Sequence, residues 1–190
     1  MRRLLAIALA AASLSAGGAA QAATAATTRP EDVATQQDFM KRVNDYYTLR
    51  NKLGANDTKQ SESAAEVANN QDQLAAKVRQ QRAKAKHEDI FTDKVEEFFR
   101  REIKASYRGG NGSRIETSLN HAEPTPKIEL RVNAKYPSSL PLQSTPPTLL
   151  QNLPRLPKGL EYRVLGRDLI LYDSATNLIV DYIHEALPSR

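Results

Sequence analysis

The sequence predicts an α+β protein in which helices come first and a small antiparallel β-meander follows. Up to residue 108, apolar residues recur three and four positions apart, which is the period of a helix with one buried face. After residue 127 they alternate with polar residues or form short runs between turn signals, as strands do. We therefore expect a helical region over 35–108, a linker over 109–126 and a small β-rich C-terminal domain over 127–190.

A secretory signal peptide is expected over residues 1–22. Two arginines precede an apolar run from Leu4 to Leu14, and a small-x-small cleavage site ends at Ala22. The run is shorter than the roughly 20 residues of a membrane-spanning helix, and no cysteine follows that could carry a lipid. We expect a protein exported to the periplasm by a Sec-type signal, neither membrane-spanning nor a lipoprotein, with a flexible lead-in over 23–34.

The first helix is expected to begin at Thr35, because Thr35 and Asp38 have the spacing of a capping box. Gly54 should end it. A charged residue stands at one step of its otherwise apolar stripe, which consists of Phe39, Val43, Tyr46, Arg50 and Leu53.

The second helix is expected to begin at Ser63, which forms a capping box with Glu66, and to reach about Lys86. Its apolar stripe is thin, so it should pair with the first helix as an antiparallel helical hairpin. Five cations lie near its end, namely Lys77, Arg79, Arg82, Lys84 and Lys86. They have two interpretations: a solvated face that complements the helix dipole, or a docking patch for anionic envelope components.

A third helix should follow Thr92, with acids in its first turns and bases in its last, as the helix dipole favours. Three of the four phenylalanines of the chain, Phe91, Phe98 and Phe99, lie on its apolar side. We expect this side to pack the helical region on its neighbours.

Four antiparallel strands are expected in the C-terminal domain. Residues 128–134 alternate with period two, and the runs 160–165, 168–172 and 178–183 form a meander joined by two turns. Six of the ten prolines flank a leucine-rich segment, 149–156, which should form a short helix that covers the sheet.

The polar positions of the meander include Arg163, Arg167, Asp168 and Asp181. Turn capping and cross-strand pairing would explain them, each pair contributing about 0.2–1 kcal/mol. In the alternative interpretation they mark an interaction surface, because the edge of a meander can accept a strand from a partner.

Composition and motifs do not favour an enzyme. The net charge of +5 is mild and no basic, aromatic-rich face is evident, so nucleic acid is not an expected partner. The absence of cysteine excludes disulfides and thiolate chemistry. The three histidines lack metal-ligand spacing, so we expect no metal and no cofactor, although His184, Glu185 and Asp181 together are conceivable ligands.

Two segments, FTDKVEEFFRREI and LPRLPKGLEYRVLGRDLILYDSATNLIVDYI, resemble a family of uncharacterised exported bacterial proteins with no established activity. The second segment also resembles, more loosely, the hairpin of small periplasmic proteins of nickel and cobalt homeostasis. The matching positions are Pro157, Gly159, Tyr162, Gly166, Leu171 and Asn177. The chain departs from that pattern at Asn177, where the pattern has glycine, and it lacks histidine-rich stretches.

We expect a non-enzymatic interaction or scaffolding module of the cell envelope, with an envelope protein as partner and the helical hairpin as its arm. The alternatives are a periplasmic ligand- or metal-responsive binding protein, with a pocket between the sheet and its proline-rich cover, and a hydrolase of envelope polymers. Monomer and dimer both stay open.

Overall fold

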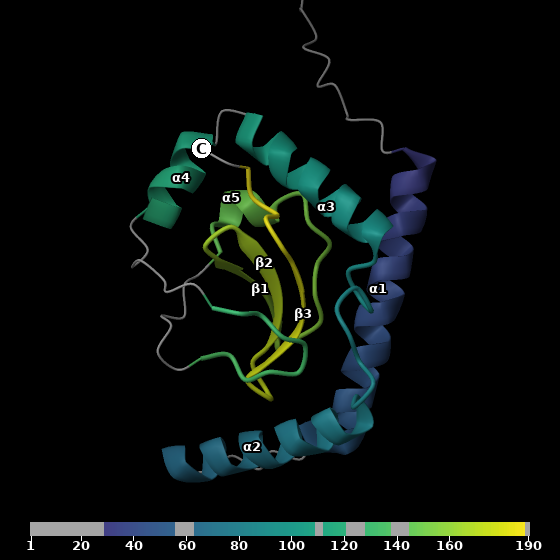
Figure 1. Ribbon diagram of the computed structural model, residues 1–190, viewed down its shortest axis with the longest axis vertical. Helices are drawn as coiled ribbons and strands as arrows, with labels where there is room; N and C mark the ends of the chain where they lie inside the picture. Colours follow the sequence, from purple (N-terminus) through teal and green to yellow (C-terminus); the bar gives the residue numbers. More distant parts are fainter. Residues whose placement is uncertain (1–28, 56–62, 109–111, 121–127, 138–144, 189–190) are drawn as a thin grey trace, which may run out of the picture.

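The described residues fold as five α-helices around a three-stranded antiparallel sheet, which confirms the α+β class (Figure 1). The computed structural model describes residues 29–55, 63–108, 112–120, 128–137 and 145–188. The predicted signal peptide lies outside the described residues, as does the predicted lead-in up to residue 28. The elements are α1 (Pro30–Arg50), a π-helical turn η1 (Asn51–Ala55), α2 (Ala64–Gln81), α3 (Asp93–Ser106), α4 (Gly112–Asn120), α5 (Pro147–Leu150), β1 (Leu160–Leu165), β2 (Asp168–Asp173) and β3 (Leu178–Ile183).

Helix α1 begins at Pro30, ahead of the predicted cap at Thr35. Proline suits the first position of a helix because its missing N–H would find no helical partner there. Glu31 and Asp32 follow it and complement the positive end of the helix dipole. The Thr35 hydroxyl does not cap the helix but donates to the Glu31 carbonyl at 2.8 Å. The lead-in predicted over 23–34 is thus helical from Pro30 onward.

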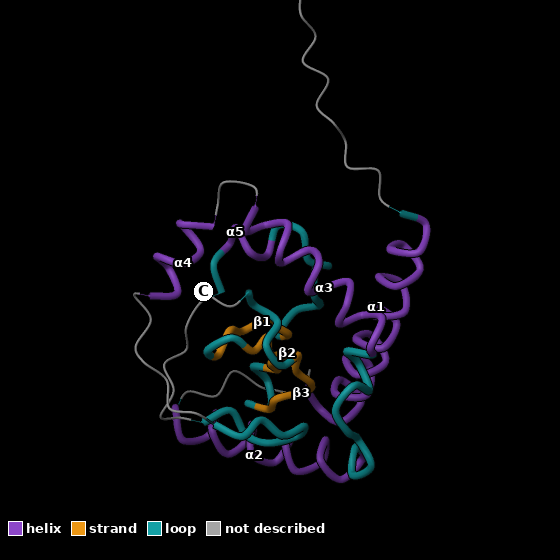
Figure 2. The backbone as a smooth tube through the Cα atoms, turned by 45° about the horizontal axis from the view of Figure 1, so that its top comes forward, coloured by secondary structure: helices purple, strands orange, loops and turns teal. Residues whose placement is uncertain are grey.

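The chain turns after α1 where the sequence predicts it, at Gly54, whose φ of 114° suits glycine. Ser63 caps α2 as predicted, since its side chain accepts the N–H of Glu66 at 3.2 Å. The antiparallel arrangement of the pair is not seen. Helix α2 turns away from α1 and lies across one end of the sheet, so the two helices form a corner (Figures 1 and 2). It ends at Gln81 rather than near Lys86.

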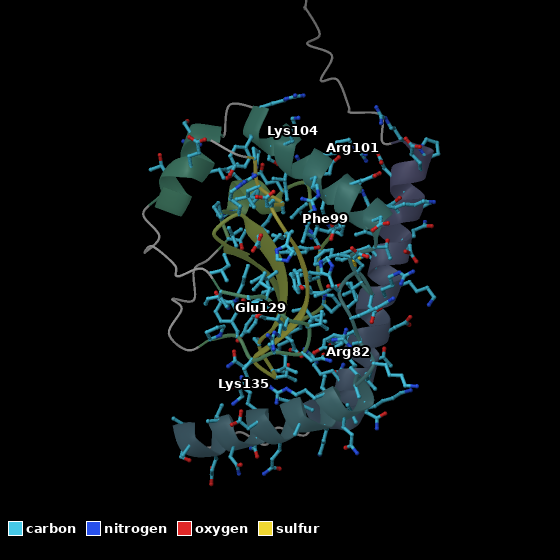
Figure 3. The ribbon with its side chains drawn as sticks, viewed as in Figure 1. Arg82, Phe99, Arg101, Lys104, Glu129 and Lys135 are labelled. Atoms are coloured by element: carbon cyan, nitrogen blue, oxygen red, sulfur yellow. The ribbon has the colours of Figure 1, made fainter. Side chains whose placement is uncertain are left out.

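The core is centred on aromatic rings from α1, α3 and β1. Phe39 of α1 stacks on Phe91 with ring centroids 5.4 Å apart and meets the edge of Phe99 at 4.9 Å. Phe99 in turn lies 5.7 Å from Tyr162 of β1. Figure 3 shows Phe99 on the side of α3 that faces the sheet. The predicted packing role of the phenylalanine-rich face is confirmed.

The sheet has the order β1-β2-β3, so β1 is an edge strand. Gly166, with a φ of 61°, and Arg167 form the two-residue turn between β1 and β2. A bulge shifts the register of β2 against β3. Both faces of the sheet are buried. One packs on the helices, and the other forms a second apolar cluster of Leu130, Tyr136, Leu165, Ile170, Tyr172, Ile179 and Tyr182.

Among the described residues, the fourth strand predicted over 128–134 does not form. Asn133 has a φ of 63°, which interrupts the extended backbone. The segment still runs beside β3, because the Asn133 N–H donates to the Ile179 carbonyl at 2.8 Å and Lys135 forms an isolated bridge with Leu178. It pairs with the free edge of β3 over this single bridge, and its Leu130 and Tyr136 belong to the second apolar cluster.

Two short helices complete the core. Residues 112–120, expected inside the linker, form α4, and its Ile115 is fully buried in the same cluster as α3 and the sheet. The predicted proline-flanked helix is α5, whose Leu149 is also fully buried. Within the described ranges, no helix combines the length and hydropathy that crossing a bilayer requires.

The buried face of α1 ends in an ion pair with the sheet. Arg50 Nη1 donates to Asp173 Oδ1 at 2.8 Å, and the two side chains are 5% and 0% exposed. Asp173 also accepts the hydroxyls of Tyr46, at 2.6 Å, and Thr176, at 2.9 Å. Burial and the adjacent carboxylate raise the pKa of Tyr46, so its hydroxyl keeps its proton. Since Arg50 Nη2 donates to the Lys158 carbonyl at 3.2 Å, the network joins α1 to the turn before β1, to the end of β2 and to the β2–β3 turn.

The ion pair leads to a stability prediction. Arg50→Met leaves Asp173 buried without its counter-charge, which should lower the free energy of unfolding by about 3 kcal/mol. The control Lys41→Met breaks the exposed pair with Asp45 on the same helix and should cost no more than about 0.5 kcal/mol. Urea unfolding followed by circular dichroism measures both variants. Equal losses would show that the buried pair does not stabilise the fold.

Candidate ligand-binding site

A cleft of about 540 Å³ lies between β1 and the proline-flanked segment that precedes it in the chain. It occupies the region where one interpretation of the sequence placed a pocket between the sheet and its proline-rich cover. Its wall is apolar, with two arginines and one acid. The lining residues are Thr145, Leu150, Leu153, Pro154, Arg155, Leu156, Leu160, Glu161, Tyr162 and Arg163.

Two hydrogen bonds attach the proline-flanked segment to β1. The Thr145 hydroxyl donates to the Tyr162 carbonyl at 2.6 Å, and the Tyr162 hydroxyl donates to the Pro154 carbonyl at 2.9 Å. Burial raises the pKa of Tyr162 well above its ordinary value, so the hydroxyl stays a donor. Tyr162 therefore holds the proline-flanked segment at two points, through its backbone carbonyl and through its hydroxyl.

Arg163 supplies the charge at the cleft, and its side chain is only 10% exposed. Its guanidinium lies over the ring of Tyr172 at 4.3 Å and near that of Tyr136 at 5.6 Å. One nitrogen, Nη2, donates to Glu161 Oε2 at 2.7 Å. Nε is buried without a hydrogen-bond partner in the described part of the chain. A buried N–H of a charged group is costly to leave unpaired, so the site favours an anionic acceptor.

The chemistry of the cleft is that of an amphipathic anion site. Leu150, Leu153 and Leu156 line the cleft with apolar side chains, and Arg163 and the exposed Arg155 also line it and carry positive charge. Arginine binds carboxylates with paired N–H donors. A pocket that is largely apolar with a few convergent polar groups is typical of small-molecule sites.

The other predicted meander residues lie elsewhere and hold the C-terminal residues in place. Arg167 Nε donates to the Leu187 carbonyl at 3.2 Å, and its Nη1 pairs with Glu185 Oε1 at 3.1 Å. Asp168 accepts the N–H of Glu185 at 2.8 Å. These contacts account for Arg167 and Asp168 by turn and loop bonding, which was one of the two interpretations of the sequence.

Asp181 is fully buried. Its Oδ2 accepts the N–H groups of Ile90 and Phe91 at 2.9 and 3.0 Å, and its Oδ1 accepts that of Tyr182 at 2.9 Å. Burial raises the pKa of Asp181, while these bonds lower it. Because both oxygens are engaged, Asp181 ties the loop before α3 to β3. The conceivable metal site that it would share with His184 and Glu185 is not assembled.

The five cations near the end of α2 differ in their surroundings. Arg79 and Arg82 reach into the fold: Arg79 Nε donates to the Asn133 carbonyl at 2.9 Å, and Arg82 donates to the Val180 carbonyl at 3.3 Å. Burial lowers the pKa of Arg82, which lies at the corner of α1 and α2 (Figure 3). The exposed cations are Lys77, Lys84 and Lys86.

A second cleft of about 540 Å³ separates the start of α1 from α3. Two of its acids already have partners, because Asp32 pairs with Arg101 and Asp38 accepts from Arg42 at 2.9 Å. This leaves the β1 cleft as the stronger candidate.

Comparison with known proteins does not assign this chain to a family. No protein family, curated protein or solved structure matched this chain. The family resemblances inferred from its motifs therefore stay predictions.

The sequence indicated Arg163 but not its burial between the rings of Tyr136 and Tyr172. It also did not indicate that Arg50 and Asp173 form an ion pair. The signal for Arg50 was present, since a charged residue occupied a core step of the first helix. His87 and Glu96 were passed over because they are not spaced as ligands on one helix, yet the fold brings them close. Glu96 Oε1 is the second buried side-chain atom without a partner in the described residues.

The difference between the hydrogen-bonded Arg82 and the exposed Lys84 can be tested. Arg82→Ala removes hydrogen bonds to Val180 and Asn133 and should lower the free energy of unfolding by about 2 kcal/mol. Lys84→Ala removes an exposed charge and should change it by less than about 0.5 kcal/mol. Denaturant titration of both variants is the measurement. A loss in Lys84→Ala as large as in Arg82→Ala would contradict the structural role.

Proposed function

We propose that this protein is a non-enzymatic binding protein of the bacterial cell envelope, whose site is the cleft beside β1. The observation that carries the proposal is Arg163, a guanidinium that is nine-tenths buried beside an apolar cleft with its Nε unpartnered among the described residues. A purely structural position would be filled at lower cost by an apolar side chain between the two tyrosines.

The cleft is best suited to a small apolar molecule with a carboxylate. The leucine wall would bury the hydrophobic part, at about 25 cal/mol per Å² of apolar surface. The arginines would bind the carboxylate. Glu161, which already pairs with Arg163, would disfavour a ligand that carries two negative charges. Medium-chain acyl carboxylates have these properties, and the predicted export would place the cleft close to membrane lipids.

A protein-interaction module is the second candidate. The edge position of β1 favours it, because the open side of an edge strand can accept an extended segment of a partner. The arm-like helical hairpin that first suggested an interaction module lends less support. Arg79 of α2 is hydrogen-bonded to Asn133, and Arg82, just after α2, is hydrogen-bonded to Val180 of β3.

Calorimetric titration of the purified protein with decanoate, decanol and decylamine tests the small-molecule site. Decanoate should bind one to one, and decanol at least about tenfold more weakly, because it lacks the charge-assisted hydrogen bond. Decylamine should bind weakest of the three. Equal affinities for the three head groups would remove Arg163 from recognition, and no heat with any of them would exclude acyl ligands.

Leu156→Asp places a negative charge in the apolar wall and should abolish decanoate binding. Val67→Asp is the matched control, since Val67 is 53% exposed on α2 away from the cleft. If a peptide is the natural occupant, affinity purification should recover a partner with the wild type and the Val67→Asp variant, but not with Leu156→Asp.

A further inference from the structure

Three side chains capable of binding a metal ion, His87, Glu88 and Glu96, come together where His87 stacks on Tyr182 of β3. His87 and Glu88 belong to the loop between α2 and α3, and Glu96 lies in the first turns of α3. One candidate ligand atom from each residue lies within 4.8 Å of the other two. His87 Nδ1 is 3.4 Å from Glu88 Oε1, and His87 Nε2 is 3.6 Å from Glu96 Oε1.

The histidine is oriented as in metal centres. Its Nε2 lies 2.9 Å from the Tyr182 carbonyl, which can only accept, so Nε2 carries the proton and donates it. The ring also stacks on the Tyr182 ring at a centroid distance of 4.3 Å. In the neutral ring, Nδ1 then carries the lone pair, and this nitrogen lies 3.4 Å from Glu88 Oε1. A ligating histidine that donates its other N–H to a backbone carbonyl is the usual outer-sphere arrangement of metal sites.

Glu96 is the second and independent observation. Its Oε2 accepts from Arg100 Nη2 at 2.6 Å, while its Oε1 is buried and has no hydrogen-bond partner in the described ranges. Arg100 is itself fixed, because its Nη1 donates to the His184 carbonyl at 2.6 Å. The carboxylate therefore holds one free oxygen toward His87. The N–H of His87 Nε2 faces this oxygen at 3.6 Å, beyond hydrogen-bond distance, so a bound cation would satisfy the oxygen better than the structure alone does.

We propose that His87, Glu88 and Glu96 bind one divalent transition-metal ion, with Zn²⁺ the best match. One imidazole nitrogen and two carboxylate oxygens suit zinc, whereas calcium and magnesium prefer oxygen ligands alone. Tetrahedral zinc places its ligand atoms about 3.3 Å apart, so small side-chain rotations complete the site and leave a fourth position for water. This site is separate from the β1 cleft and does not depend on the function proposed for it.

Chelator-treated protein titrated with Zn²⁺ alone, by calorimetry at neutral pH, tests the assignment. One ion should bind per chain. Glu96→Gln, which keeps the shape of the side chain, and His87→Ala should each weaken Zn²⁺ binding by at least about tenfold. Co²⁺ in place of Zn²⁺ gives a second readout, since its visible absorption reports coordination by nitrogen and oxygen independently of heat.

Glu97→Gln is the matched control, because Glu97 is the exposed neighbour of Glu96 on the same helix. It should bind Zn²⁺ as the wild type does, and the metal-free unfolding midpoints of all variants show whether they fold. No stoichiometric binding by the wild type overturns the proposal. The proposal is also overturned if Zn²⁺ binding survives in both His87→Ala and Glu96→Gln, or if it is lost only in His184→Ala, because the ion would then bind elsewhere. The contacts of His87 with Glu88 and Glu96 would in that case be ion pairs alone.

Discussion

The buried pair of Arg50 and Asp173 determines how the helical part of the chain meets the sheet. Two charges removed from water are tolerated only with good geometry and additional hydrogen bonds, which Tyr46 and Thr176 supply. Because hydrogen bonds are directional and apolar contacts are not, this network fixes the position of α1 along the meander more narrowly than the core alone. It also constrains Gly159, where a Cβ would lie 3.0 Å from Arg50 Nη1 and where φ is 84°. A side chain there would push the arginine away from its partner.

Each candidate site lies where a segment outside the sheet is hydrogen-bonded to the meander or to the residues just after it. Once α1 is placed, Phe39 organises the aromatic cluster, and that cluster positions α3 and the ring of Tyr162. The hydroxyl of Tyr162 then holds the wall of the β1 cleft. On the other side, α3 brings Arg100 to the backbone that follows β3, and this contact orients Glu96. A change in the position of α1 on the sheet would therefore alter both sites together.

Features set by local periodicity could be predicted from the sequence, and features set by long-range hydrogen bonds could not. The stripe of α1, the cap at Ser63, the phenylalanine-rich face of α3 and the meander follow from spacing alone. The corner between α1 and α2 depends on Arg79 and Arg82 reaching carbonyls far away in the chain, so no local pattern contains it. Arg163 was selected as one of the polar positions of the meander, but spacing alone could not show that its face of the sheet is buried. That face is covered because Tyr136 packs over it from a segment that was expected to be a strand.

Among the described residues, the two buried side-chain atoms without a hydrogen-bond partner have opposite chemistry, which argues against a common structural cause. Poor packing would leave orphan groups of any kind at arbitrary places, whereas here one is a guanidinium N–H beside a cleft and the other a carboxylate oxygen beside an imidazole. Native folds rarely keep such groups without a partner, so each points to a group that binds from outside. Their complements differ in sign, an anion at Arg163 and a cation at Glu96. A protein with only a mild net charge would thus recognise two different ligands by local charge rather than by a general field.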